Sequence, residues 1–387
     1  MERIIMHIDV NNAFLSWTAV DLLKHGHKDI RNECSIIGGD ESKRRGIVLS
    51  KSTPAKKMGV KTAETIYQAR KKCPKLKVYP PNHKLYKEMS NSLFKLLSKY
   101  TNDIEVVSID ECFLDYGKVK NIYGDEVSFA YKIKDEIYNT LGFTVNVGVA
   151  NNKLCAKMAS DFSKPNKVHT LYMNEVKEKM WPLPIGDLYG IGKSSEIKLK
   201  NLKINTIKDL ATADSKLLRP YFKNQTNHII DIANGIDDSE VISEESDRTS
   251  ISTTETLIYD YDDIEEINKE LKLIANKLSK ELKSKNKYCY TIAIIIKDMY
   301  FKTTTRQNKL KNSTNNEEII YEISTKLFRD NWDSTPIRLI GIRLDSLTER
   351  NDYQISLFEN AEEKIEDDKL NKTIDYLKEK YGNNIIK

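Results

Sequence analysis

The stretch Val106-Val107-Ser108-Ile109-Asp110-Glu111-Cys112-Phe113-Leu114-Asp115 decides how we expect this chain to fold. Two apolar, β-branched runs flank an adjacent pair of carboxylates, and each run is typical of a short strand. On an unbroken strand Asp110 and Glu111 would point to opposite faces, so both can reach one site only if the chain turns or bulges there. Two carboxylates at such a turn could bind a hard cation such as Mg²⁺. The same residues are equally typical of a solvated hairpin turn, where acids are common.

Residues 4–10, Ile-Ile-Met-His-Ile-Asp-Val, supply a further carboxylate. We predict a buried strand that presents Asp9 at its C-terminal end. Asn11 and Asn12 would then cap a helix over residues 13–23, where apolar side chains recur at helical spacing. A carboxylate beside the free amides of a helix N-terminus can hold a metal and an anion together, although Asp9 could also be an ordinary helix-capping acid.

Two later segments add lysines. A hairpin predicted over residues 36–49 leads to a short helix that Pro54 opens and that carries Lys56, a candidate for triphosphate contact or a plain solvated side chain. A strand over residues 144–150 is followed at once by a helix that ends before Lys164-Pro165. Alternating strands and helices predict an α/β layer with a mixed sheet, and the three acids would converge on one of its edges.

The second half of the chain has the marks of a nucleic-acid binder. The turn Gly190-Ile191-Gly192-Lys193 lies between two short predicted helices and resembles a helix-hairpin-helix that binds a DNA backbone; the alternative is a plain helical hairpin. Beyond a polar linker at residues 237–247, a second α+β unit carries Lys302, Thr304 and Arg306 on a predicted strand. Such side chains contact phosphates in protein–DNA complexes, and a solvated sheet face would explain them as well.

The composition limits the class of protein. The chain has 387 residues and a net charge of +5, which permits a nucleic-acid partner without arguing for one. Its five cysteines form no Cys-x-x-Cys pair, so we predict neither a zinc site nor a disulfide framework. The N-terminus lacks the pattern of a signal peptide, and no apolar run approaches the roughly 18 residues that span a bilayer. We therefore expect a cytoplasmic protein with no membrane partner.

Taken together, three motifs resemble the Y-family DNA polymerases, the lesion-bypass group that includes bacterial DNA polymerases IV and V. They occur in the family's order, and the resemblance extends to about residue 350. The motifs are Ile8-Asp9-Val10-Asn11-Asn12-Ala13-Phe14, Ser108-Ile109-Asp110-Glu111-Cys112-Phe113-Leu114-Asp115, and Val147 to Asp161 with Lys164-Pro165-Asn166.

The resemblance implies a multidomain protein of α/β and α+β class: a polymerase palm with small fingers, a helical thumb with a helix-hairpin-helix, and a C-terminal α+β little-finger domain. The implied bounds are 1–170 for the palm with fingers inserted at about 20–75, 171–236 for the thumb, 237–247 for a linker, 248–346 for the little finger and 347–387 for a tail.

The resemblance also implies site residues. Asp9, Asp110 and Glu111 match the carboxylates that bind two Mg²⁺ ions, and the carbonyl of Val10 would complete the nucleotide-side metal. Phe14 matches the aromatic side chain that excludes a ribose 2′-hydroxyl. The positions that match nucleotide contacts are Val10, Asn12, Ala13, Phe14, Thr53, Lys56 and Lys164. The positions that we assign to DNA contact are Gly190, Gly192, Lys193, Lys302, Thr304 and Arg306.

Three features depart from the common pattern or extend it. Thr53 and Lys56 stand where many relatives have Tyr and Arg, so the phosphate contact is a point charge rather than a planar fork. Asn11 replaces a common second Asp. Residues 354–358 place the apolar side chains of Leu357 and Phe358 after Gln354 in a polar setting, which predicts a docking peptide and resembles the sliding-clamp-binding motif of bacterial polymerases.

The leading hypothesis is a template-directed polymerase of low fidelity and without proofreading, whose partners are primer–template DNA, dNTPs and a bacterial sliding clamp and which we expect to be a monomer. One alternative is a non-catalytic, clamp-associated DNA-binding protein that keeps the fold. Another is a palm-type nucleotide cyclase, which would need neither the helix-hairpin-helix nor the basic second unit.

Overall fold

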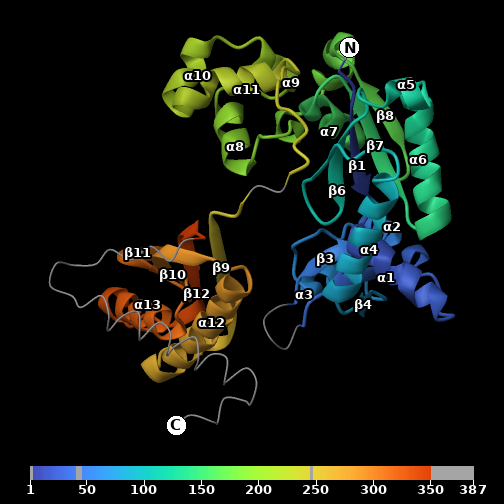
Figure 1. Ribbon diagram of the computed structural model, residues 1–387. Coiled ribbons are helices and arrows are strands. Elements are labelled where there is room, and N and C mark those ends of the chain that lie inside the picture. The colour runs from blue at the N-terminus through green and yellow to red at the C-terminus, as the bar shows by residue number, and fades with distance from the viewer. Residues whose placement is uncertain (1–2, 41–45, 245–246, 350–387) are drawn as a thin grey trace. The chain divides into compact units, whose positions relative to one another are not determined.

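The computed structural model describes residues 3–40, 46–244 and 247–349. The chain divides into two units, Met1–Ser246 and Asp247–Lys387, and each is described by itself below (Figure 1). The predicted α/β and α+β multidomain class is confirmed, because the first unit holds mixed sheets with helices and the second holds an antiparallel sheet with two helices.

A five-stranded sheet forms the centre of the first unit, in the order β5-β6-β1-β7-β8. The first strand lies in the middle and runs antiparallel to both neighbours, whereas β7 and β8 are parallel. The sheet is therefore mixed, as predicted. Its strands are β1 (Ile5–Val10), β5 (Ile104–Val106), β6 (Glu111–Asp115), β7 (Val145–Ala150) and β8 (Val168–Leu171).

The two faces of β1 pack against different helices. Met6, Ile8 and Val10 belong to a core shared with α1, α4 and α6, whereas Ile5 belongs to a second core shared with α7. Because side chains alternate along a strand, the odd-numbered residues of β1 face α7. The helices are α1 (Ala13–Lys24), α4 (His83–Leu97), α5 (Lys120–Tyr123), α6 (Glu126–Leu141) and α7 (Lys153–Asp161).

Two residues fix how helices join this sheet. A Cβ on Gly148 of β7 would lie 2.0 Å from the carbonyl oxygen of Ala156, so only glycine lets α7 pack this closely. Asn12 occupies the N-cap position of α1 in a left-handed conformation, with φ of 49°, and its side chain makes no capping hydrogen bond. The predicted helix thus begins where expected, without the expected side-chain cap from Asn12.

A small three-stranded sheet, in the order β3-β2-β4, has a core of its own and corresponds to the predicted fingers. The predicted hairpin is present, since β2 and β3 are antiparallel; residues 41–45 of its turn lie outside the described residues. Ser52 caps α2 through its side chain, and Thr65 forms a capping box with Gln68 at α3. The elements are β2 (Ser35–Gly38), β3 (Val48–Lys51), β4 (Lys77–Tyr79), α2 (Thr53–Lys57) and α3 (Ile66–Lys72).

Four short helices complete the first unit and share the core that α7 buries. They are α8 (Lys193–Asn201), α9 (Ile207–Ala211), α10 (Ser215–Phe222) and α11 (Thr226–Ala233). The chain after α11 is hydrogen-bonded to the sheet region: the Asp237 carboxylate accepts from the amide of Leu154 at 3.0 Å, and the amide of Ile242 donates to Glu105 at 2.9 Å. The first part of the predicted linker is therefore tethered.

The second unit is a four-stranded antiparallel sheet, in the order β11-β10-β12-β9, whose apolar face packs against two helices. The predicted helices and the later strands are present. The first strand, β9, was not among the predicted elements, because its residues Ser250–Tyr261 mix Thr, Ser and charged side chains in an irregular pattern of burial. The elements are β9 (Ser250–Tyr261), α12 (Ile264–Ser284), β10 (Tyr288–Asp298), β11 (Thr303–Thr314), α13 (Glu317–Asn331) and β12 (Ile337–Thr348).

Candidate active site

The pairing of β1 with β6 places two of the predicted acids side by side. Asp9 lies opposite Glu111, and His7 lies opposite Phe113. Directly opposed residues of antiparallel strands project to the same face, so His7, Asp9 and Glu111 share the face that α7 covers. The predicted convergence of Asp9 and Glu111 thus follows from strand register alone.

The chain turns between β5 and β6, as the strand geometry of Asp110 and Glu111 requires. The amides of Val107 and Ser108 both donate to the Glu111 carbonyl oxygen, at 3.1 and 3.3 Å. Asp110 lies in this turn, and its carboxylate accepts from the Ser108 hydroxyl at 2.7 Å. Burial and the negative charges of Asp9 and Glu111 raise the pKa of Asp110 despite that hydrogen bond. The three acids therefore lie close enough for the charges of Asp9 and Glu111 to act on Asp110.

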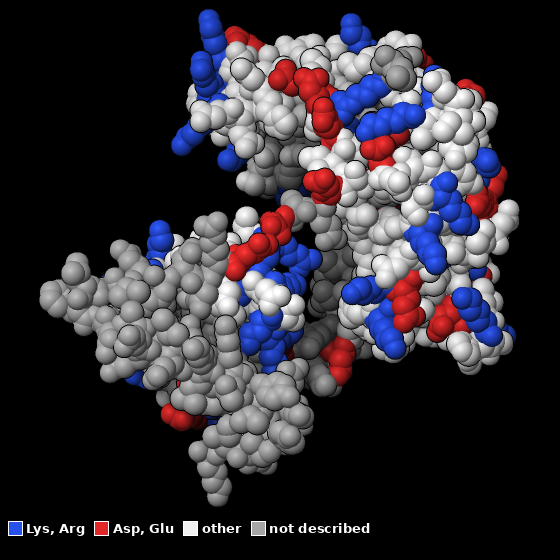
Figure 2. Space-filling model, in the orientation of Figure 1, with Lys and Arg blue, Asp and Glu red and all other residues white. Residues whose placement is uncertain are grey.

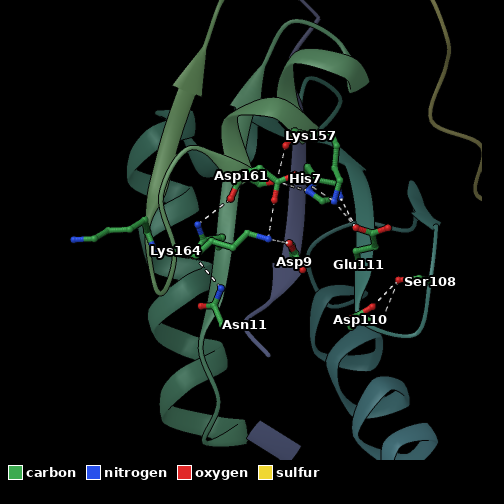
Figure 3. Close-up of polar contacts among 12 residues, drawn as sticks. His7, Asp9, Asn11, Ser108, Asp110, Glu111, Lys157, Asp161 and Lys164 are labelled. Carbon is green, nitrogen blue, oxygen red and sulfur yellow. Dashed lines mark hydrogen bonds and ion pairs between the residues drawn. The ribbon is translucent and has the colours of Figure 1, made fainter. Parts of the chain in front are cut away.

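Two lysines from the α7 side balance these acids. Lys164 forms an ion pair with Asp9, and Lys157 forms one with Glu111 at 2.6 Å. In Figure 3, Lys164 reaches Asp9 from the left and Lys157 reaches Glu111 from above. Asp161 contacts both ammonium groups, at 2.7 Å from Lys164 and 3.8 Å from Lys157. Burial alone would lower the pKa of each lysine, but the surrounding acids raise both.

Glu111 is the most strongly stabilised of the acids in its charged form. Contacts with His7 and Lys157 lower the pKa of Glu111 to about 2, although burial acts in the opposite direction. His7 is fully buried, with Nε2 3.4 Å from the Glu111 carboxylate and Nδ1 2.8 Å from the Ser160 hydroxyl. Burial lowers the pKa of His7, so Lys157 is the cation that neutralises Glu111.

A buried amide network holds the segment that carries Lys164. The Asn11 side chain accepts from the amide of Asn166 at 2.8 Å and donates to Asn146 at 3.1 Å. Asn146, on β7, donates to the carbonyl oxygen of Ser163 at 2.6 Å. Asn11 therefore positions the Lys164 segment.

A cavity of about 360 Å³ joins these residues to the fingers sheet. Every residue predicted to contact a nucleotide lines it, together with Asp9 and Asp110. Glu111 is not among the lining residues, because its carboxylate is turned to Lys157. The lining residues are Asp9, Val10, Asn11, Asn12, Ala13, Phe14, Leu49, Ser50, Lys51, Thr53, Lys56, Thr62, Asp110, Lys164 and Pro165.

The cavity is polarised. Asp9 comes from β1 and Asp110 from the turn before β6, with Lys164 paired to Asp9 on this side, while Lys51 and Lys56 come from the fingers. Burial and the neighbouring charge of Lys56 lower the pKa of Lys51, whose ammonium donates to the Thr62 hydroxyl at 2.8 Å. Acids on one wall and lysines on another suit a ligand that brings both a cation and phosphate groups.

The acids fit a hard divalent cation in donor chemistry and charge. Carboxylate oxygens and a backbone carbonyl are ligands that Mg²⁺ prefers. Burial, together with the charges of Asp9 and Glu111, raises the pKa of Asp110, and a bound cation would favour its ionised form. Within residues 3–40, 46–244 and 247–349, no three His, Cys, Asp or Glu side chains are already grouped to hold a metal. Lysine ammonium groups contact Asp9 and Glu111 instead.

Comparison with known proteins identifies the family. Models of the impB/mucB/samB family, its C-terminal domain and the IMS family HHH motif match residues 8–161, 248–357 and 174–204. The chain is 45% identical to the DNA polymerase IV of Clostridium acetobutylicum, over 100% of this chain and 97% of the relative. A solved structure titled "Y-family DNA polymerase chimera Dbh-Dpo4(243-245)-Dbh" superposes with a TM-score of 0.79 at 26% identity, covering 90% of this chain and 100% of that one.

The chain belongs to the Y family of DNA polymerases. It is therefore a DNA-directed DNA polymerase of the translesion type. Its palm contains the five-stranded sheet, its fingers the three-stranded sheet, its thumb the helices α8 to α11, and its little finger the four-stranded sheet of the second unit. A second relative, the DNA polymerase IV of Clostridium kluyveri, is 35% identical over 100% of this chain and 98% of its own length.

Phe14 of this polymerase is held rigidly at the cavity. Its ring stacks on Tyr86 with 4.4 Å between centroids and 7° between planes. The Tyr86 hydroxyl is 3.0 Å from that of Thr18, which fixes the supporting ring. A side chain fixed in this way can act as a steric check on whatever lies beside it.

The turn that precedes α8 is built on two glycines and leaves open space beside its backbone. Gly190 has φ of +91°, which favours glycine, and nothing lies within 4 Å of a Cβ added to Gly192, the N-cap of α8. Lys193 opens the helix and is exposed. Basic side chains gather over α8 and α10 at the upper left of Figure 2.

The little-finger sheet separates the predicted DNA contacts. Thr304 and Arg306 pair with Ile296 and Ile294, which pack under the helices, and the Arg306 guanidinium donates to Asn331 of α13 at 3.0 Å. Both predicted residues therefore lie on the helix side. Lys302 lies in the turn before β11. The opposite, open face carries the exposed residues Thr305, Gln307, Lys309 and Lys311.

Two further predictions concern the tail and a membrane. The clamp-binding residues Gln354, Leu357 and Phe358 lie outside the described residues. No helix in the described part of the chain is long and apolar enough to cross a membrane.

Sequence reasoning missed several residues of this site, namely His7, Lys51, Thr62, Lys157 and Asp161. His7 could have been found from its spacing, because it precedes Asp9 by two positions on a strand and so shares its face. Lys157 could not, since its contact depends on how close Gly148 lets α7 approach the sheet.

Proposed function

We propose that the cavity binds a deoxynucleoside triphosphate beside the end of a primer, and that the polymerase adds it to the primer 3′-hydroxyl under the direction of a template. The observation that carries this proposal is the polarised cavity, with two acids on the palm wall, one of them paired with Lys164, and two lysines on the fingers wall. The partners are therefore primer–template DNA and dNTPs. Translesion relatives with the same fold support this assignment.

We propose two Mg²⁺ ions as cofactors, held by Asp9, Asp110, Glu111 and the carbonyl oxygen of Val10. Two such ions supply Lewis-acid activation of an attacking oxygen and charge stabilisation on the leaving oxygen of an in-line displacement. The protein's part is to hold three acids close together, and the pKa of Asp110, raised by burial and by the charges of Asp9 and Glu111, supports a site that a cation would stabilise.

The remaining lining residues orient the nucleotide. Lys56 and Lys164 provide ammonium groups for the triphosphate, and the hydroxyl of Thr53 adds a donor. Lys56 acts as a point charge, so it attracts the phosphates without fixing their orientation as a bidentate arginine would. Phe14 lines the cavity with its ring stacked on Tyr86, which supports a role in excluding a ribose 2′-hydroxyl and so in selecting deoxyribose.

Low fidelity and the lack of proofreading complete the proposal. The fingers consist of strands of three or four residues and helices of five and seven, so they enclose little of a nascent base pair. The three family matches account for most of the chain as palm, thumb motif and little finger.

We propose a sliding clamp as a further partner, bound through residues 354–358 by a monomeric polymerase. Deletion of these residues should abolish stimulation of synthesis by the clamp of a related bacterium and leave basal extension unchanged. Equal stimulation of the deletion variant and the wild type would remove the motif from clamp binding.

Primer extension tests the central proposal. Wild-type protein should extend a primer one template-directed nucleotide at a time when dNTPs and Mg²⁺ are present, and EDTA should stop it. Complete absence of extension, with DNA binding intact, would favour the non-catalytic alternative instead.

A further inference from the structure

Lys157 makes an ion pair that the proposed reaction does not explain. It lies on α7, its side chain is only 14% exposed, and its ammonium is 2.6 Å from the Glu111 carboxylate. It is absent from the residues that line the nucleotide cavity. Unlike Lys164, it therefore has no triphosphate beside it to take over its charge.

The ammonium of Lys157 and a divalent cation would draw on the same carboxylate. An acid that pairs fully with a buried ammonium has less charge to offer a metal, and a bound metal repels that ammonium at short range. Replacing the ammonium by a metal costs most where little water can solvate the separated charges. The side chains of Lys157 and Glu111 are mostly buried, at 14% and 21% exposure.

Asp161 is a second carboxylate that contacts both lysines. It is 49% exposed, accepts from Lys164 at 2.7 Å and lies 3.8 Å from Lys157. Figure 3 shows it near both ammonium groups. When the ammonium groups leave the metal-binding acids, Asp161 is the carboxylate that can receive them.

We propose that Lys157 is an internal counter-cation of the metal-free polymerase, which holds Glu111 in place and competes with the divalent ion, and that Asp161 weakens this competition by drawing the lysine away. This inference rests on the proposed function only in taking Glu111 as a metal ligand. Lys157 is thus a positioning residue that acts through Glu111 and sets the concentration at which the metal site fills.

Mn²⁺ binding to the full-length protein, without DNA or dNTP, tests the proposal by electron paramagnetic resonance of the free ion. Lys157→Met should bind Mn²⁺ about tenfold more tightly than wild type, since one charge is removed from a partly buried site. Lys157→Arg keeps the charge and should bind with nearly wild-type affinity.

Lys153→Met is the matched control. Lys153 lies one turn earlier on α7, has the same 14% exposure and pairs with Glu105 at 2.7 Å, but it touches none of the proposed metal ligands. Its replacement should leave the Mn²⁺ dissociation constant unchanged. General loosening of α7 would affect both methionine variants, and it would weaken metal binding rather than tighten it.

Asp161→Asn predicts an effect of opposite sign. Both lysines lose their alternative partner and should pair more fully with Asp9 and Glu111, so the Mn²⁺ dissociation constant should rise about threefold or more. Asp161 is half exposed, so this variant also tests the proposal if Lys157→Met does not fold.

The outcomes separate the inference from the proposed function. If wild type binds Mn²⁺ and Asp110→Ala does not, but folded Lys157→Met matches wild type or binds more weakly, the counter-cation proposal is overturned. Unchanged affinity in Asp161→Asn would overturn the part assigned to that acid. If wild type itself fails to bind Mn²⁺ at millimolar concentration, the two-metal proposal fails first.

Discussion

The cavity beside Asp9 and the open face of the little-finger sheet both carry lysines, but they hold that positive charge differently. In and beside the cavity, Lys164 pairs with Asp9 and Lys157 pairs with Glu111, so a carboxylate neutralises each of these ammonium groups. On the open face, Lys309 and Lys311 project from an edge strand into solvent. The effect of a buried, paired charge depends on its position relative to its partners. The contribution of exposed charges to DNA affinity depends on how many there are and on the salt concentration.

The sharpest test of this difference is Asp110→Ala. Loss of one acid from the cavity should lower the rate of primer extension about 10³-fold or more, because the metal stabilisation of the transition state depends on it. Affinity for primer–template DNA, measured by fluorescence anisotropy, should stay near wild type. Asp103→Ala is the control. The Asp103 carboxylate pairs with Lys118 at 2.6 Å, and neither residue lines the cavity. Substantial residual extension would take Asp110 out of the metal site.

Phe14→Ala should have the next largest effect. Removing the ring opens space beside the sugar, so the ratio of ribonucleotide to deoxynucleotide incorporation should rise about 10- to 100-fold, within the range that steric pockets discriminate. Phe14→Tyr retains the ring and should retain the selectivity. Single-nucleotide kinetics with dCTP and CTP measure the ratio, and an unchanged ratio in Phe14→Ala would mean that another residue performs the check.

Exposed charges of the little finger should give smaller, salt-dependent effects. Lys309→Ala with Lys311→Ala should weaken DNA binding about tenfold at moderate salt and reduce the slope of log K against log [salt] by about two. Arg306→Ala, on the helix side, should change the slope by less. If Arg306→Ala gives the larger change, the open face is not the DNA-binding face.

The smallest effect concerns stability in acid. Because the folded-state pKa of Glu111 is about 2, below its ordinary value of 4.5, its ionised form stabilises the fold above pH 4.5 and this contribution is lost as the pH falls toward 2. Without metal, Glu111→Gln should lower the free energy of unfolding by about 1–2 kcal/mol at pH 6, after allowance for screening. Urea denaturation should show the difference shrinking by pH 3, and a constant difference would contradict the assigned pKa.

Short-range patterns predicted the palm well. Local patterns were enough to predict the strand that ends at Asp9, the turn that carries the acids and the strand before α7. The register of β1 with β6 then brings Asp9 opposite Glu111. The resemblance to a family added the roles of Phe14 and Thr53, which no local pattern assigns.

The features that could not be predicted depend on contacts between distant segments, or on which face of a sheet alternate residues of a strand occupy. Thr304 and Arg306 were correctly placed on a strand, but which face they occupy is decided by pairing with Ile294 and Ile296. The strand β9 has too irregular a pattern to be recognised without its partner β12. The contact of Lys157 depends on Gly148, nine positions earlier, which lets α7 approach the sheet closely.

The two-sided packing of β1 also constrains which length changes the gene can tolerate. Met6, Ile8 and Val10 belong to one core, and His7 and Asp9 belong to the polar face. One codon gained or lost within the strand would slip the register and exchange the faces, placing an acid in the apolar core and an isoleucine among the lysines. We expect in-frame insertions of a single residue here to be as damaging as loss of Asp9, and paired insertions of two residues to be less so.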